Sequence, residues 1–237
     1  MRRACLNIAH RGASGRFPEN TLTAFRAAIE AGADMCELDV QSTRDGVVMV
    51  MHDETLDRTT DGYGPLSALT LAEAKALNIV SGRDRTVTGE RVPTLDEVFA
   101  LTRGRCALNI ELKGAAVEAA VCRSVRDNGE LEKSMVSSFD WSALERARAI
   151  EPEIRIGVLG ERAPNKMLAA ASELKAVAIN PRFKLVDAAL CAEAHRRGLQ
   201  VYVWTVDDVR AMRSMLDRGV DGIMTNYPER LRALIEE

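Results

Sequence analysis

The side chains best suited to chemistry in this sequence are two histidines, three carboxylates and two cations that stand on or just after short apolar segments. They are His10, His52, Glu37, Asp39, Glu111, Arg11 and Lys113. Three carboxylates that share one place repel one another unless a cation or protons neutralise them. Oxygen ligands without cysteine favour Mg²⁺ or Ca²⁺. The sequence therefore predicts one divalent cation, Mg²⁺ or Ca²⁺, bound by Glu37, Asp39 and Glu111.

The remaining groups match the needs of phosphodiester cleavage. A metal ion, a guanidinium and an ammonium together hold the non-bridging oxygens of a phosphodiester and stabilise added negative charge. Arg11 and Lys113 are the predicted phosphate ligands. Two imidazoles can move protons to and from the reacting oxygens, so His10 and His52 are the predicted catalytic pair. The sequence does not assign which of the two histidines is the acid and which is the base.

Structural explanations compete with these assignments. A Glu-x-Asp pair in a strand is more often exposed or paired in a salt bridge, but Glu37 and Asp39 lie within the apolar segment 35–41, where burying charge is costly unless it is compensated. His195 precedes basic residues at a helix C-terminus, which favours a structural role against the helix dipole. Trp204, near the end of a predicted strand, is either core filler or a wall for the substrate's alcohol, and we predict the wall.

Eight apolar or β-branched segments alternate with helix-length amphipathic segments, which indicates an α/β protein. The predicted strands span 4–9, 35–41, 106–112, 134–139, 154–159, 175–180, 199–205 and 220–225. The predicted helices span 20–31, 94–102, 115–128, 141–150, 164–173, 185–197, 207–217 and 228–236. Capping signals at Thr94, Ser142 and Asp207 support three helix starts. Eight units in 237 residues favour a (β/α)8 TIM barrel over a doubly wound sheet. The carboxyl ends of barrel strands share one rim, which would gather the residues above.

Two segments interrupt the alternation. Val47–His52 reads as an extra strand that follows 35–41 after a link too short for a parallel crossover, so we predict a hairpin extension after strand two. A two-residue turn at Asp45-Gly46 places His52 opposite Asp39, and a three-residue turn places it opposite Leu38. Either register returns the histidine to the carboxylates. The segment 53–92 is predicted to be a small insertion over the barrel mouth, with one short helix at 70–77 and otherwise loop.

Composition favours a single domain spanning 1–237. Hydrophobic residues make up 46% of the chain, which is enough for a sizeable core, and no linker-like stretch divides it. A net charge of -3 gives no broad surface for nucleic acid or anionic membrane, so the expected partner is a small molecule, with a homo-oligomer left open. Five scattered cysteines argue against disulfides and zinc, and we expect reduced, mostly buried thiols. Without a signal-like start or an 18-residue apolar run, the expected location is cytoplasmic and no stable membrane association is expected.

Several motifs together resemble the glycerophosphodiester phosphodiesterase family. They are His10-Arg11-Gly12, Pro18-Glu19-Asn20-Thr21, Glu37-Leu38-Asp39-Val40, His52-Asp53, Glu111-Leu112-Lys113 and Trp204-Thr205-Val206, and they span nearly the whole chain. The resemblance implies a barrel related to that of phosphoinositide-specific phospholipase C. It also implies the same metal, histidine and phosphate roles for the seven residues above. The implied products are glycerol 3-phosphate and an alcohol.

The chain departs from the family pattern at Asn226 and Asp207, where relatives often carry Asp and Asn, and at 78–83, which lacks an aromatic-containing stretch. These departures bear on substrate preference. We expect the loop Thr225–Pro228 to shape the alcohol pocket with Trp204, with phosphate bound elsewhere.

Three other functions are considered. A phosphodiesterase for lysophospholipids would need an apolar entrance, for which only Leu66, Leu69 and Leu71 are candidates. A non-catalytic phosphate-binding barrel would be expected to lack a histidine or a metal carboxylate. A sugar-phosphate isomerase would need one general base and no cluster of three carboxylates.

Overall fold

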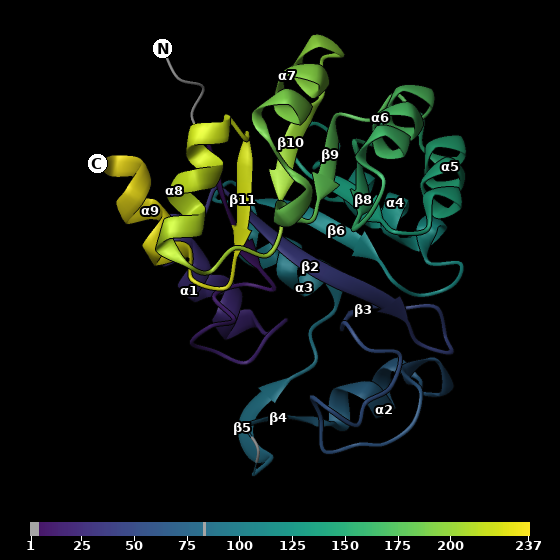
Figure 1. The fold of residues 1–237 in the computed structure, drawn as a ribbon. Helices are drawn as coiled ribbons and strands as arrows, with labels where there is room; N and C mark the ends of the chain where they lie inside the picture. The colour runs from purple at the N-terminus through teal and green to yellow at the C-terminus, as the bar shows by residue number, and fades with distance from the viewer. Residues whose placement is uncertain (1–4, 83) are drawn as a thin grey trace.

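The computed structural model describes residues 5–82 and 84–237 and shows a closed barrel of parallel strands (Figure 1). The barrel strands are β1 (Leu6–His10), β2 (Met35–Ser42), β6 (Ala107–Leu112), β7 (Met135–Ser138), β8 (Ile156–Gly160), β9 (Ala178–Pro181), β10 (Gln200–Val203) and β11 (Gly222–Thr225). Each strand pairs with the next in this order, and β1 also pairs with β11, which closes the ring. The predicted (β/α)8 barrel is confirmed.

Helices follow the barrel strands and surround the ring (Figure 1). They are α1 (Leu22–Glu30), α3 (Leu95–Thr102), α4 (Glu118–Asp127), α5 (Trp141–Ile150), α6 (Pro164–Glu173), α7 (Ala188–Arg196), α8 (Val209–Arg218) and α9 (Pro228–Glu236), with a 3₁₀ turn η2 (Phe183–Leu185) before α7. Side chains that point out of the ring, such as Cys36 and Leu38, pack with helix residues such as Phe25 and Phe99 in the main core. A smaller apolar cluster that includes Ile8 and Tyr202 fills the lower interior of the barrel.

The capping predictions had mixed outcomes. Thr94 caps α3 in a reciprocal box with Glu97, as predicted. The prediction for Ser142 was wrong, because Asp140 caps α5. Its carboxylate accepts hydrogen bonds from the backbone N–H and the hydroxyl of Ser142, which places Ser142 inside the first turn. Asp208, not Asp207, likewise caps α8, which leaves Asp207 available for another contact.

The hairpin after β2 adopts the three-residue turn. Strand β3 (Val48–Val50) runs antiparallel to β2, and the pairs Val40 with Val50 and Ser42 with Val48 exclude the two-residue register. Gly46 closes the turn with a φ of 81°, in the left-handed region that a turn of this kind requires. Asp45 is tied by hydrogen bonds from the Thr43 hydroxyl and the backbone N–H of Leu71. His52 therefore follows β3 beside the carboxylates.

The insertion is more ordered than the sequence predicted. It contains η1 (Leu66–Ala68), the predicted short helix α2 (Leu71–Ala76), and an antiparallel hairpin of β4 (Asn78–Ser81) and β5 (Thr86–Arg91) that we did not predict. The residues of β5 are mostly exposed, so no apolar alternation marks the strand in sequence. The insertion has its own small apolar cluster, and Leu66, Leu69 and Leu71 belong to it or pack against it. These leucines therefore do not form an open apolar entrance.

The helices and the cysteines bear on the expected membrane association and redox state of the chain. Among residues 5–82 and 84–237, no helix is both long enough and apolar enough to cross a lipid bilayer. All five cysteines are free thiols in buried positions, as expected from their scattered spacing.

Candidate active site

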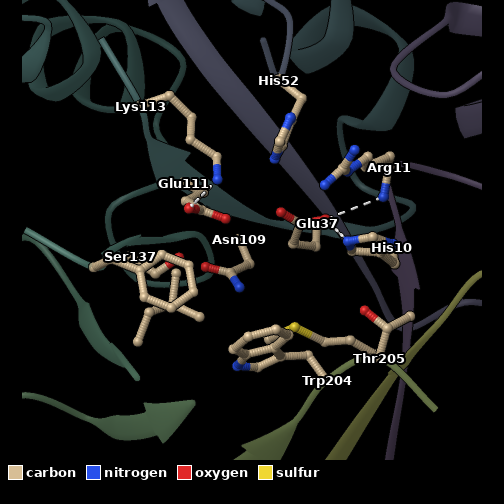
Figure 2. Close-up of a pocket in the computed structure, with 13 residues that line it drawn as sticks. His10, Arg11, Glu37, His52, Asn109, Glu111, Lys113, Ser137, Trp204 and Thr205 are labelled. Carbon is tan, nitrogen blue, oxygen red and sulfur yellow. Dashed lines mark hydrogen bonds and ion pairs between the residues drawn. The ribbon is translucent and has the colours of Figure 1, made fainter. Parts of the chain in front are cut away.

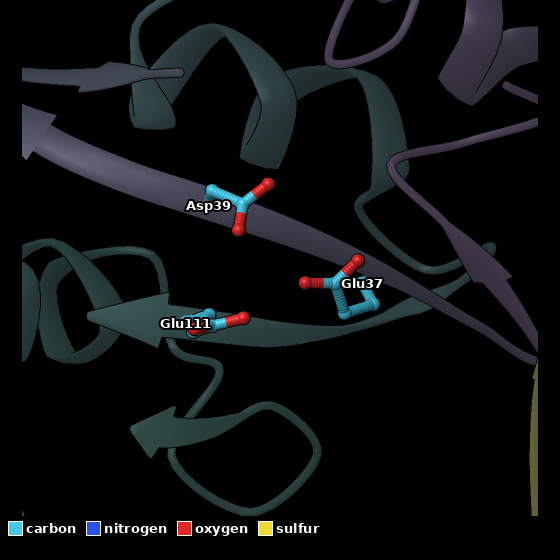
Figure 3. Close-up of side chains that lie close together, drawn as sticks. All are labelled: Glu37, Asp39 and Glu111. Carbon is cyan, nitrogen blue, oxygen red and sulfur yellow. The ribbon is translucent and has the colours of Figure 1, made fainter. Parts of the chain in front are cut away.

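Three carboxylates meet at the carboxyl end of the barrel (Figure 3). Glu37 and Asp39 lie two residues apart on β2 and so share a face, and the parallel register puts Glu111 of β6 beside Asp39. Carboxylate oxygens from all three lie within 4.8 Å of one another. All three residues are buried. Their separation is well inside the limit of about 8 Å that one ion with short ligand bonds could bridge.

Two carboxyl groups of the cluster, those of Glu37 and Glu111, hold their protons more tightly than exposed carboxyl groups do. Burial, followed by the charges of Asp39 and Glu111, raises the pKa of Glu37 well above its ordinary value. Burial and the charge of Asp39 raise the pKa of Glu111 to about 7, although Lys113 opposes the shift. Crowded negative charge is thus only partly balanced by the protein.

Two cations approach the cluster from opposite neighbours of β2. Lys113 Nζ lies 2.6 Å from Glu111 Oε1 and 3.6 Å from Asp39 Oδ1. Arg11 Nε lies 3.2 Å from Asp39 Oδ2, while Arg11 Nη1 donates a hydrogen bond to Glu19. Arg11 has a φ of 56°, and its backbone N–H donates to the carbonyl and carboxylate of Glu37. This turn, in a backbone region that is strained for residues other than glycine, aims the guanidinium at the cluster.

One carboxylate oxygen of the cluster lacks a hydrogen bond from the described residues. Asp39 Oδ1 is buried and accepts no hydrogen bond from any residue that the structure describes. The other carboxylate oxygen accepts from Asn20 Nδ2 at 3.0 Å. Lys113 Nζ, at 3.6 Å, gives this oxygen an ion-pair contact but no hydrogen bond, and a buried carboxylate oxygen without a hydrogen bond is unfavourable unless something binds it. An all-oxygen donor set with this free atom fits a hard divalent cation.

His10 is held by a chain of two further side chains. Its Nδ1 lies 2.7 Å from Asn226 Oδ1, and Asn226 Nδ2 donates to Asp207 Oδ2 at 2.6 Å. Because the Asp207 carboxylate can only accept, the Asn226 oxygen must face the ring, so His10 carries its proton on Nδ1. Nε2, 3.9 Å from Glu37 Oε2, is then free to accept a proton. Burial and the charge of Arg11 lower the pKa of His10, which favours this neutral form.

His52 has a charged partner instead. Its Nδ1 lies 2.6 Å from Asp53 Oδ1. Arg58 of the insertion donates both to Asp53 and to Glu19, and Glu19 in turn accepts from Arg11. The carboxylate orients the His52 ring through this contact, while the arginine joins the insertion to both sides of the site.

A pocket of about 170 Å³ connects these groups (Figure 2). It is lined by His10, Arg11, Glu37, His52, Asn109, Glu111, Lys113, Ser137, Phe139, Leu159, Trp204, Thr205 and Met224. Trp204 lies across from the charged groups in Figure 2, its indole N–H donates to the carbonyl of Asn180, and its ring meets that of Phe139 edge to face at 5.5 Å. One side of the pocket is therefore aromatic.

The structure brings the eight residues selected from the sequence into one place. Seven line the pocket, and Asp39 lies buried beside Glu37 and Glu111. Sequence reasoning missed Asn109, Ser137 and Phe139. The first two are neutral side chains inside strands, whereas Phe139 directly follows β7, a rim position that could have suggested it.

Two other expectations concern residues outside the pocket. His195 lies elsewhere, at the end of α7, where its Nε2 is 2.8 Å from Asp221 Oδ2, in keeping with a structural role. Among the residues that the structure describes, none from the loop Thr225–Pro228 lines the pocket. Asn226 of this loop contacts His10 instead.

Comparisons with known proteins agree with this geometry. A sequence profile of the "Glycerophosphoryl diester phosphodiesterase family" matches residues 10–230. A glycerophosphodiester phosphodiesterase of Caldanaerobacter subterraneus subsp. tengcongensis is 37% identical, over 98% of this chain and 98% of that protein. The structure of a glycerophosphodiester phosphodiesterase from Agrobacterium tumefaciens has a TM-score of 0.86 and 32% identity, over 95% of this chain and 98% of that one. A phosphodiesterase of Oleispira antarctica, solved with the product sn-glycerol-3-phosphate, has a TM-score of 0.87 and 29% identity, over 97% and 96%.

Proposed function

Because the chain belongs to the glycerophosphoryl diester phosphodiesterase family and is a phosphoric diester hydrolase, we propose that it hydrolyses glycerophosphodiesters to glycerol 3-phosphate and an alcohol in a metal-dependent reaction. The observation that carries this proposal is the pocket where three buried carboxylates, two cations and two histidines converge. The product seen in the Oleispira antarctica relative supports the same small-molecule substrate class.

Glu37, Asp39 and Glu111 are the proposed ligands of one divalent cation, Mg²⁺ or Ca²⁺. Asp39 Oδ1, which accepts no hydrogen bond from the described residues, and the spacing of the three carboxylates support this assignment. When bound, such a cation supplies positive charge that stabilises negative charge on the phosphoryl oxygens.

Arg11 and Lys113 are the proposed phosphate ligands. Both line the pocket, and both hold their cationic groups beside the carboxylates from neighbouring strands. They can therefore contact the non-bridging oxygens of a phosphodiester from two sides, through hydrogen bonds strengthened by charge. Lys113 stays charged for this role, because the charge of Glu111 raises its pKa although burial opposes the shift.

His10 and His52 are the proposed base and acid. The free Nε2 of His10 accepts the proton of the attacking oxygen, which comes from water or from the neighbouring hydroxyl of the substrate glycerol. A phosphorus–oxygen bond forms to this oxygen, and the bond to the head-group oxygen breaks. When the glycerol hydroxyl attacks, the product is a transient cyclic phosphate, which water then opens to glycerol 3-phosphate by breaking one ring phosphorus–oxygen bond. His52, whose protonated form Asp53 stabilises, donates a proton to the departing alkoxide. The two environments differ in charge, which separates the two roles.

Trp204 is the proposed wall for the leaving alcohol, together with Phe139. Their edge-to-face contact gives the pocket an apolar side opposite the charged groups. We also propose that residues 1–237 form a single domain that includes the insertion at 53–92, because Arg58 donates a hydrogen bond to Glu19 and the apolar cluster of the insertion includes Met49 of β3. A single cooperative transition in urea, followed by both fluorescence and circular dichroism, is expected; two separate transitions would contradict this proposal.

The proposal is tested by assaying purified protein with glycerophosphocholine, glycerophosphoethanolamine and a lysophospholipid, each with and without EDTA. Release of glycerol 3-phosphate from the first two substrates, lost in EDTA and restored by Mg²⁺ or Ca²⁺, is expected. Hydrolysis that persists in EDTA would contradict the metal assignment. Preference for the lysophospholipid would favour the lipid-directed alternative, although the packed leucines of the insertion argue against it.

A further inference from the structure

Two neutral polar side chains on the inner wall of the pocket have no hydrogen-bond partner. Both amide atoms of Asn109 and the hydroxyl of Ser137 are buried without a partner among residues 5–82 and 84–237. Each residue has no exposed surface, yet each lines the pocket (Figure 2). Buried polar groups in folded proteins almost always have a partner, so three unpaired polar atoms around one cavity indicate that something binds there.

The strand register places these side chains inside the barrel at the level of the carboxylates, and neither has exposed surface. Asn109 of β6 pairs with Glu37 of β2, one inward-facing level below Glu111, and Ser137 of β7 pairs with Glu111. Below this level the barrel interior is filled by apolar side chains such as Met35 and Met135, which offer no hydrogen bonds. The side-chain amide of Asn180, near Gly157 and Met135, is also buried without a hydrogen-bond partner among the described residues, but Asn109 and Ser137 are the two that line the pocket, where a ligand can reach them.

The chemistry of the two groups identifies the kind of partner. An amide and a hydroxyl each offer both a donor and an acceptor and carry no charge, which suits hydroxyl groups. A phosphate is served better by Arg11 and Lys113, which hold the positive charge of the site. The part of the pocket lined by Asn109 and Ser137 thus matches a small, neutral, hydroxyl-bearing part of a ligand.

We propose that Asn109 and Ser137 form a glycerol subsite, in which they hydrogen-bond hydroxyl groups of the substrate's glycerol half; this inference rests on the proposed function. The head-group alcohol lies at the other side of the phosphate, toward Phe139, whose side chain is 44% exposed and so borders the open mouth. The enclosed end fits the half that all glycerophosphodiesters share, and the open end fits the half that varies.

Calorimetric titration in Mg²⁺ tests the subsite with two probes, sn-glycerol 3-phosphate and propyl phosphate. Both carry the same phosphate, but propyl phosphate lacks both hydroxyl groups. The wild type should bind glycerol 3-phosphate at least about tenfold more tightly, since a site built around hydroxyl groups is left with unpaired polar atoms by the analogue. Ser137→Ala and Asn109→Leu should each reduce this ratio severalfold and leave binding of propyl phosphate nearly unchanged.

Thermal unfolding supplies a second readout. Because the Ser137 hydroxyl has no hydrogen-bond partner among the described residues, Ser137→Ala should not lower Tm, and an unchanged Tm would show that a loss of selectivity is not caused by misfolding. Ser138→Ala is the matched control, because the neighbouring hydroxyl already donates to the carbonyl of Leu112 and does not line the pocket. It should keep the wild-type ratio.

The outcomes separate the subsite from the proposed function. A folded Ser137→Ala protein that keeps the full wild-type ratio would overturn the role of Ser137, and the same result for Asn109→Leu would overturn the subsite as a whole. A wild type that binds both probes equally would also overturn it, even if it hydrolyses glycerophosphocholine normally. A wild type that selects glycerol 3-phosphate but does not hydrolyse glycerophosphocholine would reject the proposed function and leave the subsite supported.

Discussion

The metal-free protein should become less stable as pH rises from about 4.5 to about 7, and a divalent cation should remove this loss. Burial and the charge of Asp39 raise the pKa of Glu111 from 4.5 to about 7 in the folded protein. Below both values the carboxyl group is protonated in either state. Between them the unfolded chain releases the proton while the folded chain retains it, so rising pH favours unfolding.

The size of the effect follows from the shift of Glu111. A change from 4.5 to about 7 corresponds to about 3 kcal/mol of unfolding free energy, at about 1.36 kcal/mol for each pKa unit. The raised pKa of Glu37 has the same sign. Glu19 acts in the opposite sense, because hydrogen bonds from Arg58 lower its pKa to about 2 although burial opposes them. Its contribution is lost only below its ordinary value, so the range from about pH 5 to about pH 8 excludes Glu19. His10, whose pKa burial and Arg11 lower from 6.5, also acts in the opposite sense within this range, so the comparison of Glu111→Gln with the wild type isolates the contribution of Glu111.

Urea denaturation across that range, in EDTA and in excess Mg²⁺ or Ca²⁺, measures the effect. Glu111→Gln should remove about 3 kcal/mol of the pH dependence in EDTA and most of the stabilisation by the cation. Glu151→Gln is the matched control, because Glu151 is also buried but pairs with Arg126 away from the site. It should respond to the cation as the wild type does. A pH dependence in EDTA that is the same in Glu111→Gln and the wild type, or a cation response that survives Glu111→Gln, would refute the reasoning.

Three further predictions concern individual side chains of the site. His10→Ala and His52→Ala should each lower kcat at least about a hundredfold without unfolding the protein, and near-normal turnover of either folded, metal-loaded variant with glycerophosphocholine would assign that histidine to structure. Asn226→Ala should lower kcat more than it changes KM and should mix the His10 ring tautomers, which ¹⁵N NMR of the three histidines detects; an unchanged Nδ1-protonated ring would contradict the positioning role. Trp204→Leu should raise KM several times more for glycerophosphocholine than for glycerophosphoethanolamine, because an aromatic face attracts a quaternary ammonium, and equal changes would count against the wall.

The barrel and most of the site could be predicted because both leave signals along the chain. Barrel strands are short apolar segments of regular spacing, and a charged residue at the end of such a segment stands out. Glu37 and Glu111 are examples of this pattern. The hairpin register could be narrowed to two choices but not decided, because Asp-Gly suits both turn lengths. Hydrogen bonds from Thr43 and Leu71 to Asp45 accompany the three-residue turn, and Leu71 is distant in sequence.

The contacts that sequence reasoning missed have no local signal. Asp207 looked like a helix cap, but its carboxylate instead fixes the Asn226 amide in the neighbouring loop. Asn109 and Ser137 carry no charge and occupy ordinary strand positions, so only the fold reveals that their polar atoms are unpaired. The exposed strand β5 lacks the alternation that identifies a half-buried strand.

The pairing of β1 with β11 makes activity depend on the last step of chain assembly. Asn226 follows β11 and stands 216 positions beyond His10, whereas His52 and its partner Asp53 are adjacent in sequence. During synthesis both histidines leave the ribosome early, but the group that sets the His10 tautomer arrives only with the final strand. A chain interrupted before β11 would carry all the proposed metal and phosphate ligands but would lack Asn226, the residue that orients His10, the proposed base. Turnover should therefore depend on whether the two ends of the chain have met, and a molecule cut before β11 should have strongly reduced activity.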